Sequence, residues 1–219
     1  MTADLSASDD TPLRADARRN RDQIIGAAKK MFAERGPDVP MEEIARRAEV
    51  GVGTLYRRFP DRDALIRAVV RDNMADALAY ARAAAVEEPT GWSALVRLLS
   101  HSTELGLSVR LSMLSPTVRK TLHGDPVLRE LRSALLTAFE TIVGTAQAEG
   151  SLRTDVSASD VAIVYALLLR QPQTMADSTA QLATGRALAL VLEGLRARPD
   201  APPDALPGRR LTAADLLLD

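Results

Sequence analysis

The sequence predicts an all-α fold of about nine helices, and two observations support this. Aromatic residues make up only 3% of the chain, whereas Ala, Leu, Arg and Glu, which lose little side-chain freedom in a helix, are abundant. Valines and isoleucines are scattered and do not alternate with polar residues over strand-length runs. An apolar content of 46% is ample for a buried core.

The placement of stop signals and apolar stripes predicts where these helices lie. The expected helices are Ala15–Arg35, Met41–Ala48, Val52–Phe59, Asp61 to about Ala85, Trp92–Leu107, Val109–Leu122 with an interruption at Pro116, Val127–Glu149, Ala158 to about Arg170, and about Thr179 to Ala197. Residues 1–13 are acidic and polar, and 199–219 contain four prolines, so both ends are expected to be disordered tails, with a transient helix over Thr212–Leu218 as an alternative for part of the second. Between these tails we expect a DNA-binding domain over 14–62 and a regulatory and dimerisation domain over 63–198.

Composition and charge narrow the classes of protein. The chain has no cysteine, which excludes disulfides, thiolate metal sites and cysteine nucleophiles. Its first twenty residues do not resemble a signal peptide, and no segment approaches the about 20 apolar residues of a membrane helix, so we expect a cytoplasmic protein. The net charge of −1 is uneven: residues 14–72 contain 14 basic and 10 acidic residues, which favours a polyanion partner for the N-terminal third.

Two short predicted helices, 41–48 and 52–59, are joined by three residues and follow a longer one, which is typical of a helix-turn-helix. Ala45 is small where the two helices must cross, and Val50 and Leu55 fill the angle between them. Tyr56 and the nearby arginines then supply the polar and cationic reach that contacts with phosphates require.

Within this segment, Thr54-Leu55-Tyr56, Phe59 and Arg62 fall in one register. The run from Met41 to Leu65 closely resembles the DNA-binding domain of the TetR family of bacterial transcriptional regulators. The resemblance is strong over about 21–68; beyond it, only the number and layout of helices match. It implies a homodimer that binds operator DNA, most simply as a repressor.

The resemblance also implies which residues contact DNA. Thr54, Tyr56, Arg58 and Arg62 would meet phosphates; Val52, Gly53 and Arg57 would face base edges; and Arg18, Arg19 and Arg21 would follow the backbone or enter a minor groove. Three positions depart from the family pattern: Pro40 stands where a capping Thr or Ser is common, Glu49 where the turn glycine is usual, and Gly51 where a capping Ser is usual. Glu49 is therefore expected to adopt an unfavourable backbone angle, and Gly51 to leave helix-end amides free.

The last long helix is apolar on two faces, so it must bury both. One face would pack within its own chain and the other against a second copy. The residues expected at the dimer interface are Ala183, Ala187, Leu188, Leu190, Val191 and Gly194.

TetR-like regulators usually hold a small-molecule effector between the helices of the second domain. The residues expected to line such a site here are Trp92, Leu99, Met113, Phe139, Tyr165 and Gln171, although each one is as readily explained as ordinary core. Nothing in the sequence identifies the effector.

Catalysis is not expected, because His101 and His123 are the only histidines and no catalytic, phosphate-binding or dinucleotide-binding motif is found; no cofactor or metal is predicted. Three alternatives stay open beside the ligand-released repressor. They are an activator, an architectural DNA-binding protein without an effector, and a ligand-binding or adaptor protein that has lost operator recognition. The intact Thr54-Leu55-Tyr56 and the pair Arg57-Arg58 argue against the last.

Overall fold

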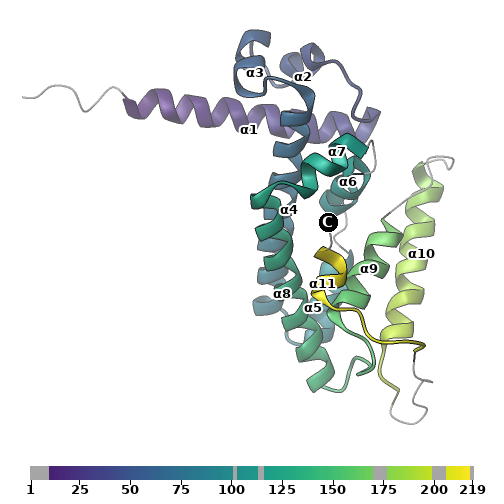
Figure 1. The fold of residues 1–219 in the computed structure, drawn as a ribbon. Helices are drawn as coiled ribbons and strands as arrows, with labels where there is room; N and C mark the ends of the chain where they lie inside the picture. Colours follow the sequence, from purple (N-terminus) through teal and green to yellow (C-terminus); the bar gives the residue numbers. More distant parts are fainter. Residues whose placement is uncertain (1–9, 101–102, 113–115, 170–176, 199–205, 218–219) are drawn as a thin grey trace, which may run out of the picture. The chain divides into compact units, whose positions relative to one another are not determined.

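The computed structural model describes residues 10–100, 103–112, 116–169, 177–198 and 206–217. The chain divides into two compact units, Met1–Val69 and Val70–Asp219. The helices (Figure 1) are α1 Asp10–Arg35, α2 Met41–Arg47, α3 Val52–Arg58, α4 Arg62–Glu87, α5 Gly91–Ser100, α6 Thr103–Ser112, α7 Pro116–His123, α8 Pro126–Ala148, α9 Ala158–Leu168, α10 Asp177–Leu195 and α11 Ala213–Leu217. The boundary between the units lies within α4.

The predicted all-α class is confirmed: the described residues contain eleven helices and no strand, apart from one isolated bridge between Leu152 and Arg196. None of these helices has the length and apolar character needed to cross a membrane. The number exceeds the expected nine because the predicted helix over 92–107 is divided into α5 and α6, and because a short α11 forms near the C-terminus. The expected interruption at Pro116 is the start of α7, where a residue without an N–H is well tolerated.

The first unit is built on one face of α1. Its predicted apolar stripe is buried, with Ile24 and Ala28 fully enclosed. The helix ends as expected at Gly36, which has a positive φ of 82°. It begins earlier than expected, so residues 10–13 belong to a helix and not to the disordered tail predicted over 1–13.

The core of the second unit is the buried face of α8, which packs mainly against α5 and also against α9. Helical spacing in the sequence predicts one buried face on α8, made of Leu128, Leu131, Leu135, Phe139, Ile142 and Ala146. All of these are buried except Leu131, which is only half-buried. Asp125 caps this helix, because its carboxylate accepts a hydrogen bond of 3.1 Å from the backbone N–H of Leu128.

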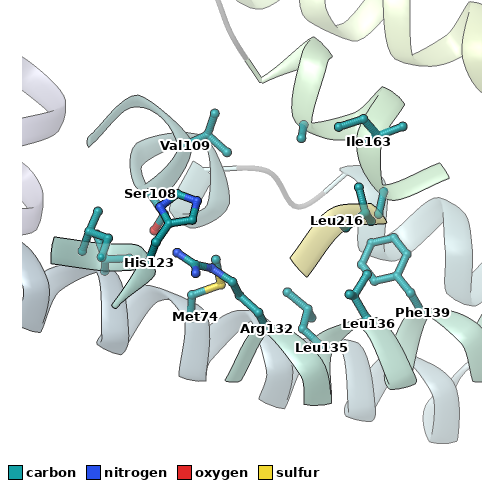
Figure 2. Close-up of a pocket in the computed structure, with 14 residues that line it drawn as sticks. Met74, Ser108, Val109, His123, Arg132, Leu135, Leu136, Phe139, Ile163 and Leu216 are labelled. Atoms are coloured by element: carbon teal, nitrogen blue, oxygen red, sulfur yellow. The ribbon is translucent and has the colours of Figure 1, made fainter. Parts of the chain in front are cut away.

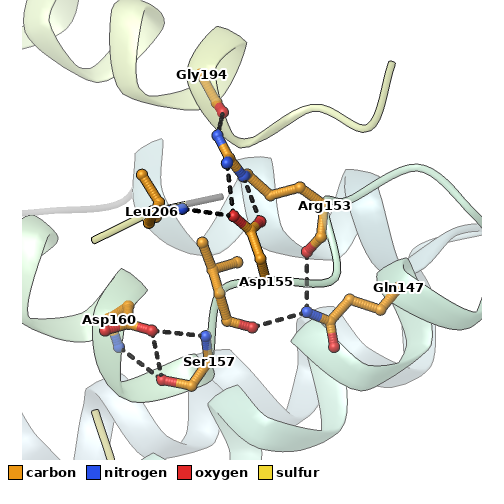
Figure 3. A network of polar contacts seen from close by, with 8 residues as sticks. Gln147, Arg153, Asp155, Ser157, Asp160, Gly194 and Leu206 are labelled. Carbon is orange, nitrogen blue, oxygen red and sulfur yellow. Dashed lines mark hydrogen bonds and ion pairs between the residues drawn. The ribbon is translucent and has the colours of Figure 1, made fainter. Parts of the chain in front are cut away.

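Polar contacts join the loop between α8 and α9 to the C-terminal part of the chain (Figure 3). Arg153 forms an ion pair with Asp155 and donates to the carbonyl of Gly194 at the end of α10. Asp155 also accepts from the backbone N–H of Leu206 at 3.2 Å. At the start of α9, Asp160 accepts from the N–H of Leu211 at 3.1 Å.

The disorder expected over 199–219 is therefore wrong for residues 206–217. The carboxylates of Asp155 and Asp160 accept hydrogen bonds from backbone N–H groups of this segment, and α11 packs against α8 and α9. The proline content predicted the lack of a long helix, but it could not reveal distant hydrogen-bond partners.

Two helices of the second unit approach each other closely at the first residue of α5. A Cβ atom on Gly91 would collide with the backbone nitrogen of Ala146 and lie 2.8 Å from the carbonyl carbon of Thr145, both in α8. The N–H of Gly91 donates to both carboxylate oxygens of Glu149, at 3.0 and 2.9 Å. Only glycine allows this contact between the backbones.

We expect Gly91→Ala to lower the free energy of unfolding by about 1 to 3 kcal/mol, because backbone atoms cannot move aside as a side chain can. Chemical denaturation followed by circular dichroism measures this. The matched control is Gly144→Ala in α8, where a Cβ meets no atom within 4 Å and helix propensity favours alanine. Equal effects of the two substitutions would contradict the proposed close packing.

An ion pair fixes the start of α8 to α4. The Arg71 guanidinium donates to Oδ2 of Asp125 from Nε at 2.9 Å and from Nη2 at 2.5 Å, and the Asp125 side chain is only 2% exposed. Burial by itself raises the pKa of Asp125, but the hydrogen bonds from Arg71 and from the Leu128 amide outweigh it and hold the pKa below its ordinary value.

A carboxylate with a depressed pKa stabilises the folded state above its unfolded pKa, about 4, and this contribution is lost as the pH falls through the folded value. Asp125→Asn retains a capping side chain but removes the charge. We expect it to lower stability by about 1 to 2 kcal/mol at pH 7. Denaturation midpoints of both proteins between pH 7 and pH 2 should converge at the acid end. A constant difference would mean that the ion pair is not responsible.

Candidate functional site

The turn between α2 and α3 keeps its shape despite an unusual residue. Glu49 has a positive φ of 57°, as the departure from the usual glycine predicts. The turn is held by hydrogen bonds from the N–H of Glu49 to the carbonyl of Arg46, and from the N–H of Val50 to the carbonyl of Ala45. Ala45 is fully buried and Val50 half-buried, so the first forms the tight crossing and the second partly fills the angle.

One face of α3 is anchored, and the other is open to solvent. Leu55 is fully buried, and Phe59, just beyond the helix, is 5% exposed. On the opposite side, the side chains of Val52 and Tyr56 are each 41% exposed. Gly51 begins the helix without a side-chain cap, as expected, and Pro40 likewise begins α2 without one. An anchored helix with an accessible face has the geometry that reading a DNA groove requires.

Most residues predicted to contact DNA are accessible. Gly53, Arg57 and Arg58 are exposed and Thr54 is half-buried. Neither arginine forms an ion pair with a described residue. On α1, the exposed Arg18 accompanies Arg19, which pairs with Asp16, and Arg21, which lies 3.4 Å from Asp22.

Two residues that were predicted to bind phosphates, Tyr56 and Arg62, form hydrogen bonds within the protein that the sequence did not indicate. The hydroxyl of Tyr56 donates to Glu42 at 3.1 Å, and this bond raises the pKa of the phenol. The half-buried Arg62 donates to the carbonyls of Pro37 and Val39, at 2.6 Å for the latter. Arg62 therefore holds the loop between α1 and α2. Because guanidinium has five N–H groups, this role leaves donors for a phosphate.

The second unit contains a cavity of about 330 Å³ that is lined by residues from six helices (Figure 2). The lining residues are Val70 and Met74 of α4, Ser108 and Val109 of α6, Leu122 and His123 of α7, Arg132, Leu135, Leu136 and Phe139 of α8, Ala162, Ile163 and Ala166 of α9, and Leu216 of α11. Figure 2 shows Ser108, His123 and Arg132 toward one end, with Phe139 and Leu216 at the other.

Of the six residues predicted to line a ligand site, the structure describes four, and among these only Phe139 is found at this cavity. Leu99 and Tyr165 are core residues, 1% and 5% exposed, and the Trp92 ring is covered by the Arg196 guanidinium at 4.5 Å. Met113 and Gln171, like His101, lie outside the described residues. The residue types of the four described residues did not distinguish a cavity wall from the interior of the core.

The sequence analysis missed Arg132, His123 and Leu216. A signal for Arg132 was available, since it lies four residues after Leu128 and three before Leu135, within the apolar face of α8. Leu216 lies in α11, within the transient helix expected over Thr212–Leu218, but the packing of α11 against α8 and α9 could not be predicted from the local sequence.

The residues predicted at a dimer interface divide between two faces of α10. Leu188, together with Leu192 and Leu195, packs against the core of its own unit. Ala183, Leu190 and Gly194 are exposed, the Leu190 side chain by 75%, and Ala187 and Val191 are half-buried. The prediction that this helix has one inward and one further apolar face is thus consistent with the structure.

Two family models match the chain. Residues 24–69 match the bacterial regulatory proteins of the TetR family, and residues 92–197 match the C-terminal domain of SbtR-like transcriptional regulators. An HTH-type transcriptional regulator of Staphylococcus aureus is 38% identical over 63 residues, which are 28% of this chain and 34% of that protein. The match thus spans only about a third of that curated relative.

Solved structures extend the similarity over most of the chain. A TetR transcription regulatory protein from Mycobacterium vanbaalenii is 30% identical, with a TM-score of 0.60, covering 85% of this chain and all of that one. A TetR transcriptional regulator from Streptomyces coelicolor is 29% identical, with a TM-score of 0.57, covering 81% and 98%. The helix-turn-helix, the second helical unit and these relatives together show that this chain is a transcriptional regulator of the TetR family.

Proposed function

We propose that this protein is a dimeric repressor that occupies a palindromic operator and leaves it when a small molecule binds in the cavity of the second unit. The observation that supports operator reading best is α3, anchored by Leu55 and open at Val52, Tyr56 and Arg57. Arg57 would donate to a guanine edge and Val52 would contact a thymine methyl group, while Thr54, Tyr56 and Arg58 would bind phosphates.

The proposed dimer uses the outward face of α10. Leu182 and Leu190 are 66% and 75% exposed there, and Leu167 on α9 is 52% exposed. Large apolar side chains gathered on two neighbouring helices indicate a surface that another chain covers. Two copies would place two recognition helices about one DNA turn, roughly 34 Å, apart.

The proposed route from effector to operator follows α4. This helix begins at Arg62, which binds the loop of the DNA-binding unit, and continues to Val70 and Met74, which line the cavity. A ligand that changes the position of Val70 or Met74 would act on the same continuous helix that carries Arg62. Such a protein would act in the cytoplasm, where its promoter is.

Selection of purified protein on random duplex DNA, read by sequencing, tests operator recognition. We expect an inverted repeat with half-sites about one turn apart. Binding without sequence preference would favour an architectural protein and contradict the proposed function.

We expect Arg57→Ala to relax the preference at one base pair of each half-site, with a loss of about 1 to 3 kcal/mol for the preferred base. The matched control is Arg58→Ala, also exposed and adjacent on α3, which should weaken binding to all sequences and reduce the salt dependence by about one ion. The same selection measures the first effect, and salt titrations of one operator measure the second. If the variants behaved alike, the assignment of base and phosphate contacts would fail.

Leu190→Glu should give a monomer with unchanged helix content, because a carboxylate would be buried at the proposed interface without a partner. Analytical ultracentrifugation and circular dichroism measure both properties. The matched control is Val86→Glu, at an apolar position 86% exposed at the end of α4, which should remain dimeric. A dimeric Leu190→Glu variant would place the interface elsewhere.

A further inference from the structure

One end of the cavity contains a cationic side chain, Arg132, on a helix face that is otherwise apolar. Arg132 lies on the face of α8 that includes Leu128, Leu135 and Phe139, and its side chain lines the cavity. Burial lowers the pKa of its guanidinium, and the electrostatic attraction of Asp125 only partly opposes this. Removing a guanidinium from water is costly unless an anion replaces the lost hydration.

The described residues do not supply that anion. None of the fourteen lining residues is Asp or Glu, and no described residue forms an ion pair or hydrogen bond with Arg132. Asp125, the carboxylate whose charge acts on Arg132, already accepts two hydrogen bonds from Arg71 and one from the Leu128 amide. The negative charge of Asp125 is therefore already paired with Arg71 at the start of α8.

Two other polar residues, His123 and Ser108, line this end of the cavity. The Nδ1–H of His123 donates to the carbonyl of Arg119 at 2.7 Å, since a carbonyl can only accept, so that Nε2 of the neutral ring is an acceptor. The hydroxyl of Ser108 accepts from the side-chain amide of Asn73 at 3.2 Å. Figure 2 shows the His123 ring beside Ser108, on the side of the cavity toward which Arg132 extends. The Arg132 guanidinium therefore supplies the N–H donors that a carboxylate needs at this end.

The opposite end is apolar and limited in size. Leu135, Leu136, Phe139, Ile163 and Leu216 surround it. At about 30 Å³ for each water-sized group, a cavity of about 330 Å³ holds a molecule of roughly ten non-hydrogen atoms. A cavity with a cation at one end and apolar walls at the other is suited to an amphipathic ligand, which has a charged head group and a short apolar body.

We infer that the cavity binds a small amphipathic carboxylate, whose head group pairs with Arg132 and whose apolar body lies between Phe139 and Leu216. This inference rests on the proposed function only in treating the ligand as the effector; binding itself does not depend on DNA. Arg132 then determines which ligands bind, and the apolar end limits their length.

Titration calorimetry of the full-length protein with octanoate and with octanamide tests the inference. The two probes have the same size and shape and differ in charge. We expect octanoate to bind about tenfold to hundredfold more tightly, the usual range for a charge-assisted pair shielded from water. Equal affinities, or binding of neither probe, would overturn the inference.

Variants of α8 separate charge from packing. Arg132→Met should lose the preference for octanoate while still binding octanamide, and Arg132→Lys, which keeps the charge, should retain a preference. The matched control is Arg129→Met, an exposed arginine on α8 outside the cavity lining, which should behave like the wild type. A preference for octanoate that survives Arg132→Met would contradict the role of Arg132.

Operator binding measured in parallel distinguishes this inference from the proposed function. If octanoate binds through Arg132 and operator affinity is unchanged, the ligand class stands and its action as an effector fails. If the selected operator is bound specifically but neither probe binds, operator recognition stands and the ligand class is wrong.

Discussion

The second unit depends on the need of α8 to bury one continuous face. That face contributes Leu135, Phe139 and Ile142 to the core, and it is the surface on which α5, α9 and α11 pack. The close approach at Gly91 and the cap at Asp125 then fix α8 near its two ends. A helix held at both ends and along one face is a rigid wall, which is a suitable support for a ligand site.

The DNA-binding unit follows a related principle on a smaller scale. A seven-residue helix has little stability of its own, so α3 depends on Leu55 and Phe59 for its position. Arg62 adds a polar tie to the loop after α1, at Pro37 and Val39. Anchoring by a few buried groups leaves Val52 and Arg57 on the opposite face of α3 exposed, whereas Tyr56 on that face also bonds Glu42 of α2.

The parts that the sequence predicted well are those in which a local pattern determines the outcome. The stripe on α1 and the buried Leu55 follow from periodicity, and the positive φ of Glu49 was expected from the resemblance to the TetR family, in which glycine is usual at this turn. The parts that it missed depend on distant partners. The hydrogen bonds of Leu206 and Leu211 to carboxylates in the loop before α9 and in its first turn, and the division between α5 and α6, could not be inferred from neighbours in the chain.

The cavity shows why its residues were harder to predict than the fold. Trp92, Leu99 and Tyr165 were chosen as candidate ligand contacts, but Leu99 and Tyr165 belong to the core and Trp92 packs against it. Large apolar and aromatic side chains are as common in cores as in ligand sites. The residue that carried information about the ligand is Arg132, a cationic residue at a position where the helical pattern predicts an apolar one. A leucine at position 132 would complete the apolar face of α8 and avoid the desolvation of a guanidinium. An arginine at such a position lowers the stability of the folded protein, and the binding of an anionic ligand would explain why it is there.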